Sequence, residues 1–217
     1  MIARAVRIAL LGLLVGPGQQ ARPDPQAVPN PQLVMDQAVR DFEAGRIEEA
    51  AGGFDRVVML VPDAEPILWQ RGIVLYYAGR YQDCREQFEL HRTVNPDDVE
   101  NAVWHFMCVS RLEGPPRARE LLLPVGQDPR RPMPEIYGMF AGETTPDEVL
   151  AAVEDAAEGS SARFYAALYV GLYHHVHGED EAARRFLGEA AGDRFVRAGG
   201  GMDMNMVARV HVALDSR

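Results

Sequence analysis

Three histidines form the densest group of potential metal ligands in the chain. His174, His175 and His177 stand within four residues, and Glu179 and Asp180 follow directly. Imidazole and carboxylate groups are the usual ligands of catalytic zinc, and a spacing of three can place His174 and His177 on one helix face. The group predicts, as one alternative, a metal-binding or hydrolytic protein. The other interpretation is structural, because the helix dipole favours histidine near the C-terminal end of a helix.

Two cysteines offer a second kind of chemistry. His105 precedes Cys108 by three residues, which would suit a metal or nucleophile site, and Cys84 lies upstream. A pair of cysteines also forms a disulfide in an oxidising compartment. Packing alone explains a small residue at position 84, so the sequence leaves the state of both cysteines open.

Acidic residues cluster after Pro96, where Asp97, Asp98 and Glu100 could hold a cation. Acidic side chains also favour the positive end of a helix, and we interpret these three as the start of one. Motifs of serine hydrolases, nucleotide-binding loops and zinc proteases (G-x-S-x-G, the Walker loop, G-x-G-x-x-G and H-E-x-x-H) are missing from the sequence. We therefore expect no catalytic residues, no metal site and no cofactor.

The composition is that of a folded protein with a negative surface. The chain has 217 residues, of which 47% are hydrophobic and 25% charged, and its net charge is −10. Such a surface repels phosphate backbones, so a nucleic-acid partner is not expected.

The N-terminus has the pattern of an exported protein. Arg4 and Arg7 precede an apolar run at residues 8–16, which is too short to span a bilayer as an ordinary helix. We predict a signal peptide at 1–18, a Pro- and Gln-rich linker at 19–31, and no transmembrane span in the mature chain. Because no cysteine follows the apolar run, we expect an unlipidated protein of the periplasm or cell envelope.

The rest of the chain repeats with a period of 34 residues. Gly45 recurs as Gly79 and Phe54 as Phe88, and further matches join Ile47 to Tyr81, Ala50 to Cys84 and Pro62-Asp63 to Pro96-Asp97. Glycine suits the tight turn of a helical hairpin, a small residue suits the point where its helices cross, and proline ends the second helix. The period predicts repeats at about 31–64, 65–98, 99–132 and 164–197, an irregular hairpin at 133–163 and a capping helix at 202–214. Within the irregular hairpin, the pattern predicts a helix at 146–158 with Thr145 as its N-cap. The fold class is therefore all-α, a single α-solenoid over 32–217.

The second repeat carries the best motif, with Trp69 and Gly72 before Gly79, Cys84 and Phe88. This pattern resembles the tetratricopeptide repeat. The segments 100–106, 136–142 and 164–178 are further similar to the NlpI-like tetratricopeptide lipoproteins of bacterial envelopes, although the lipid-acceptor cysteine of that family is missing. This resemblance implies a non-catalytic, often dimeric adaptor that holds envelope proteases and cell-wall hydrolases together.

The resemblance also places the first helix of each hairpin along one groove, where large side chains suit the capture of a peptide or helix. Its predicted partner-binding residues are Trp69, Ile73, Tyr76, Tyr77, Met107, Arg111, Leu172 and His175. The open alternative is that a neighbouring helix, such as the C-terminal one, fills this groove. An intracellular or organellar tetratricopeptide module is a further alternative. The leading expectation is an exported scaffold that binds other proteins, with a homodimer as one state that the family implies.

Overall fold

A computed structural model describes residues 29–192 and 201–216. The predicted signal peptide at 1–18, most of the predicted linker and the end of the repeat predicted at 164–197 lie outside these residues. The described part is helical and contains no strand, which confirms the all-α class. None of its helices is both long and apolar enough to cross a membrane.

The helices follow one another in pairs joined by short connections. In chain order they are α1 (Pro31–Glu43), α2 (Ile47–Leu60), the 3-10 helix η1 (Pro62–Ile67), α3 (Trp69–Tyr77), α4 (Tyr81–Arg92), α5 (Val99–Glu113), α6 (Pro115–Glu120), α7 (Met133–Ala141), α8 (Pro146–Ala151), α9 (Ser161–Val176), α10 (Asp180–Ala190) and α11 (Met204–Asp215).

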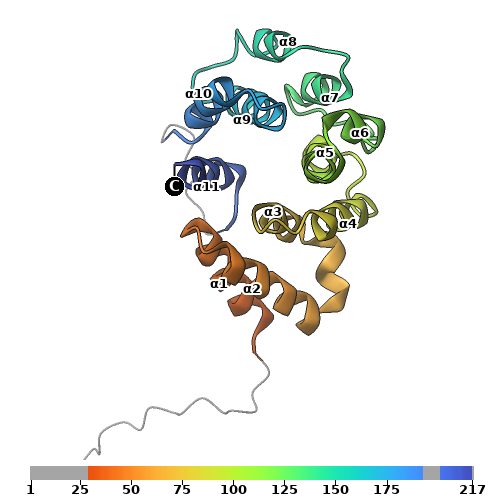
Figure 1. Ribbon diagram of the computed structural model, residues 1–217, viewed down its shortest axis with the longest axis vertical. Coiled ribbons are helices and arrows are strands. Elements are labelled where there is room, and N and C mark those ends of the chain that lie inside the picture. Colours follow the sequence, from red (N-terminus) through yellow and green to blue (C-terminus); the bar gives the residue numbers. More distant parts are fainter. Residues whose placement is uncertain (1–28, 193–200, 217) are drawn as a thin grey trace, which may run out of the picture.

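The helical pairs form a curved series, and the last helix lies between the two ends of that series. Consecutive helices pack as hairpins from α1·α2 to α9·α10, and α3 and α9 also contact α5. Helix α11 contacts both α10 and α1, so it lies on the inner side between the two ends of the series (Figure 1). The Arg209 side chain on α11 reaches Glu43 on α1 at 3.3 Å. We call this arrangement the closed array.

Two glycines show why the hairpins have their shape. Gly79 lies between α3 and α4 with φ of 70°, a left-handed conformation that a residue with a Cβ rarely adopts. Gly72 lies where α3 crosses α4, and a Cβ placed there would lie 2.7 Å from the ring of Phe88. The hairpin therefore depends on glycine once for its turn and once for its packing.

Alanine at position 72 is expected to destabilise the protein by about 1 to 3 kcal/mol, because the buried Phe88 cannot move without repacking the core. Gly52→Ala is the matched control. Gly52 lies within α2 with open space around its Cβ position, so alanine should stabilise that helix by about 0.5 to 1 kcal/mol. Urea unfolding of both variants checks the prediction, and equal changes would contradict it.

The third and fourth hairpins differ from the predicted pattern. After α6 the chain runs without a helix from residue 122 to 129, a stretch that contains Pro124 and Pro129, each without an amide hydrogen. Helix α8 ends at Ala151, seven residues before the end of the predicted helical pattern. Its start was predicted correctly: Thr145 caps the helix, and Glu148 closes the capping box.

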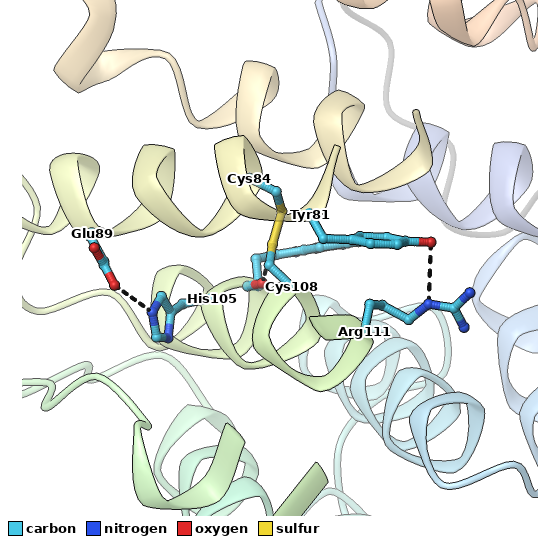
Figure 2. The surroundings of a disulfide bond; sticks show 7 residues. Tyr81, Cys84, Glu89, His105, Cys108 and Arg111 are labelled. Atoms are coloured by element: carbon cyan, nitrogen blue, oxygen red, sulfur yellow. Dashed lines mark hydrogen bonds and ion pairs between the residues drawn. A yellow bond between two sulfur atoms is a disulfide. The ribbon is translucent and has the colours of Figure 1, made fainter. Parts of the chain in front are cut away.

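Cys84 and Cys108 form a disulfide between α4 and α5 (Figure 2). Their Cα atoms are 5.9 Å apart, and both side chains are fully buried. The bond settles the pairing that the sequence left open, and it joins the second hairpin covalently to the third.

Candidate functional site

A cavity of about 470 Å³ opens on the inner side of the closed array. Its walls come from α3, α4, α5, α9 and the start of α11, and they include both tryptophans of the chain, Trp69 and Trp104. We call it the tryptophan pocket. Phe88, Phe164 and Tyr165 add three more aromatic side chains. The volume lies within the range typical of ligand sites, about 300 to 1,000 Å³.

Four helices direct their N-terminal ends at this pocket, since residues in the first turn of α3, α5, α9 and α11 line it. Three of these ends are capped by side chains. Asp98 accepts a hydrogen bond from the Glu100 amide at 3.0 Å, Ser160 caps α9, and Asp203 accepts from the Met206 amide at 2.8 Å. At each of these ends, one backbone amide that could otherwise bind an anion is therefore already satisfied.

Beside the pocket, three carboxylates share one guanidinium. Arg130 lies 2.6 Å from Asp98, 2.5 Å from Glu100 and 2.6 Å from Asp128. The segment between α6 and α7 supplies Asp128 and Arg130, and the Asp128 carboxylate also accepts from the Val99 amide at 3.2 Å. This stretch therefore fixes the charges at the start of α5.

The pKa directions show how unevenly this charge is compensated. Burial raises the pKa of Glu100 above its ordinary value, despite the hydrogen bond from the Tyr169 hydroxyl at 2.5 Å and the nearby Arg130. Burial also acts against ionised Asp128, but hydrogen bonds from Arg130 outweigh it and hold the pKa of that carboxyl low. Glu100 is thus an incompletely stabilised carboxylate of the group.

The predicted groove residues do not share one surface. Trp69 and Ile73 line the tryptophan pocket. Met107 and Leu172 are fully buried in the core. Arg111 is exposed, and its Nε donates to the Tyr81 hydroxyl at 3.2 Å (Figure 2).

The remaining three predicted residues are Tyr76, Tyr77 and His175, and they pack against α11 directly or through one another. The Tyr77 hydroxyl and His211 Nδ1 are 3.0 Å apart, and the imidazoles of His175 and His211 meet edge to face with centroids 4.6 Å apart. Tyr76 is buried between Tyr77 and Trp104. The C-terminal helix therefore fills this part of the groove, which is the alternative that the sequence left open.

The imidazole pair makes the docking of α11 sensitive to acid. Burial lowers the pKa of His211 to about 3, with a further contribution from His175, and burial also lowers the pKa of His175. Above pH 6.5 these imidazoles are neutral in both folded and unfolded chains. Below pH 6.5 these imidazoles bind protons in the unfolded chain but not in the folded one. The free energy of unfolding should therefore decrease as the pH is lowered, by up to about 1.4 kcal/mol per pH unit for His211.

Urea unfolding of the wild type and of His211→Gln between pH 7.5 and 4.5 measures this dependence. The variant should lose a large part of the slope below pH 6.5, because glutamine has no proton to bind. Parallel curves for the two proteins would contradict the assignment to His211.

The three clustered histidines have separate partners. His174 pairs with Glu179, His175 faces His211, and the Nδ1 of His177 lies 2.7 Å from the Tyr173 carbonyl. Within residues 29–192 and 201–216, no three His, Cys, Asp or Glu side chains are placed to hold one metal ion. This geometry gives the metal-binding or hydrolytic alternative no support.

Sequence reasoning missed most of the pocket. It interpreted Asp98 and Glu100 only as the start of a helix, which is confirmed by the cap of α5. It did not connect them to Arg130, about thirty residues later, or to Tyr169, although both contact them in the structure. One feature of the sequence could have indicated the pocket. Trp104 follows the acidic residues Asp98 and Glu100 within the same predicted helix.

No protein-family model matches the chain, and no curated protein matches it.

Proposed function

We propose that the protein is a non-catalytic binding protein of the cell envelope, and that it engages a partner protein through the tryptophan pocket. The observation that carries this proposal is the pocket itself, an aromatic-lined cavity at the meeting point of four helix ends. Large aromatic side chains in a concave site are the usual anchors of protein recognition.

Equivalent contacts support a tetratricopeptide-type array as the scaffold. In the second repeat Gly72 lies against Phe88, and in the last repeat Gly171 lies against Leu187. A Cβ placed on either glycine would lie 2.7 Å from the side chain opposite. The positive φ of Gly45, Gly79 and Gly178, between 70° and 74°, recurs at the turns of three hairpins. Recurrence of packing and turn at matching positions is what a repeat array requires.

The disulfide supports export. Disulfides persist in oxidising compartments and are rare in the cytosol, and the N-terminal pattern is that of a signal peptide. N-terminal sequencing of the protein isolated from its own cells tests this part. A mature chain that begins near residue 19 supports export, whereas a cytosolic chain that retains residues 1–18 contradicts it.

The composition allows a clean crosslinking test of the binding function. All 22 basic residues counted as Lys or Arg are arginines, so the α-amino group is the one amine of the chain. A carbodiimide, which joins carboxylates to amines, will therefore link this protein mainly to lysines of a partner. Captured proteins are identified by mass spectrometry, then purified and titrated against the wild type.

The decisive comparison uses Trp69→Ala in the pocket and Leu112→Ala as the control, since Leu112 is exposed and does not line the pocket. The pocket variant should weaken binding of the purified partner at least tenfold, while the control binds as the wild type does. Equal binding by both variants, with circular dichroism showing that both are folded, would place the binding surface elsewhere and overturn the proposal.

A further inference from the structure

The charges around the tryptophan pocket do not balance. Asp98, Glu100 and Asp128 face a single cation, Arg130, so the group carries a formal charge of −2 when all three carboxylates are ionised. Asp203 adds a carboxylate at the start of α11. Among the described residues that line the pocket there is no arginine. Partly buried carboxylates without a counter-charge are costly, and a second cation would relieve that cost.

The aromatic walls suit the same kind of group. Arg130 already lies over the ring of Tyr165, with its guanidinium carbon 5.7 Å from the ring centroid. Trp69 lines the cavity and is partly exposed, and the buried rings of Trp104 and Phe88 lie in its walls. Aromatic faces attract cations, and they also cover the apolar stem of a long basic side chain.

Two buried polar atoms beside the cavity are unsatisfied. Asn101 and Trp104 both line the pocket and are 4% and 1% exposed. The Oδ1 of Asn101 and the Nε1 of Trp104 have no hydrogen-bond partner in the described part of the chain. The first can accept from a cationic N–H, and the second can donate to a carbonyl. A basic residue within a polypeptide offers both groups, whereas a simple amine offers only the donor.

We infer that the tryptophan pocket binds a basic side chain, arginine or lysine, that a partner polypeptide presents, with its charge toward Asp98 and Glu100 and its stem between the aromatic rings. This inference rests on the proposed function and adds the chemistry of the group that is recognised. An anionic ligand is disfavoured, because carboxylates cap two of the helix ends at the pocket and a serine caps a third.

Intrinsic fluorescence gives a direct readout, because both tryptophans of the chain line the pocket. The full-length protein is titrated with acetyl-arginine methylamide, its lysine counterpart and the neutral isostere acetyl-citrulline methylamide, with calorimetry alongside. At least one of the two basic probes should change the tryptophan emission and bind at least tenfold more tightly than the citrulline probe. Equal affinity for citrulline, or no response to either basic probe, would overturn the inference.

Butylguanidine, which has the single charge of an arginine side chain but no carbonyl group, distinguishes a residue of a polypeptide from a free organic cation. It should bind more weakly than acetyl-arginine methylamide, since it cannot accept from Trp104. If it binds as tightly, a free organic cation is the better match and the polypeptide part of the inference is wrong.

Asp98→Asn and Asp97→Asn form a matched pair of variants. Asparagine caps a helix as well as aspartate does, so α5 keeps its start in the first variant. Asp97 is the adjacent carboxylate, exposed and outside the pocket. Binding of the better basic probe should fall at least tenfold in Asp98→Asn and should not change in Asp97→Asn, and an equal loss in both would mean only general attraction to a negative surface.

The same variants distinguish failure of this inference from failure of the proposed function. A crosslinked partner could lose binding to Trp69→Ala but still bind Asp98→Asn, while no basic probe binds. In that case the pocket recognises a different side chain, and only the inference is wrong. If no captured partner binds Trp69→Ala more weakly than the wild type, the proposed function itself is wrong.

Discussion

Replacing Arg130 with methionine should destabilise the protein by about 3 kcal/mol at pH 7. Removing one partner of a buried ion pair costs about 3 to 5 kcal/mol, and the lower end applies because the Arg130 side chain is 39% exposed. The variant would leave Asp98, Glu100 and Asp128 facing one another without a cation. The free energy of unfolding in urea measures the loss.

The pH dependence of this loss identifies its cause. In the wild type the low pKa of Asp128 contributes stability that is present at neutral pH and is lost as pH falls below its ordinary value near 3.8. In Arg130→Met the carboxylates repel one another, their pKa values rise, and protonation relieves the strain. The difference between variant and wild type should therefore shrink between pH 7 and pH 4.

Arg117→Met provides the control, because Arg117 on α6 pairs at the exposed surface with Glu120 and with Glu113, the last residue of α5. Surface ion pairs contribute little, so this variant should unfold nearly as the wild type does at every pH. A pH-independent loss in Arg130→Met would instead point to lost packing of the long side chain against Tyr165.

Loss of the Cys84–Cys108 disulfide is expected to cost about 3.5 kcal/mol, the chain-entropy value for a loop of this length. The two cysteines are separated by 24 positions, and the bond limits the unfolded chain over that distance. The double variant Cys84→Ala, Cys108→Ala keeps small residues at the crossing of α4 and α5. Its unfolding in urea should match that of the wild type measured with reductant.

Burial predicts a further property of this bond. Both cysteines are 0% exposed, so a reductant reaches the sulfurs only after the chain opens. Alkylation of the native protein under mild reducing conditions should leave both unlabelled by mass spectrometry, whereas the same treatment in urea should label both. Rapid labelling of the native protein would contradict the buried placement.

Local signals predicted the helices well, because their causes are local. Gly79 predicted a turn and Thr145 a helix start, and each acts on backbone within a few residues of itself. The end of α8 at Ala151 and the non-helical stretch after α6 were missed. In both places contacts with other elements, such as the hydrogen bond from Arg92 to the Pro124 carbonyl at 2.9 Å, replace the helical pattern.

The pocket was harder to predict because distant residues make it. The resemblance placed Trp69, Ile73, Met107 and Leu172 along one groove. Trp69 and Ile73 line the pocket, whereas Met107 and Leu172 are core residues. Whether a face is open depends on what packs over it. Helix α11 covers Tyr77 from a sequence distance of 134 residues, which no repeat pattern encodes.

Closure by α11 also bears on how the chain folds. Helix α11 contacts α1, far from it in the sequence, whereas each hairpin forms through contacts between helices that follow one another. Contacts between distant parts of a chain carry the larger entropy cost of loop closure, so the hairpins can form before α11 docks. The tryptophan pocket, which includes residues 202–205, is therefore completed by the step that closes the array.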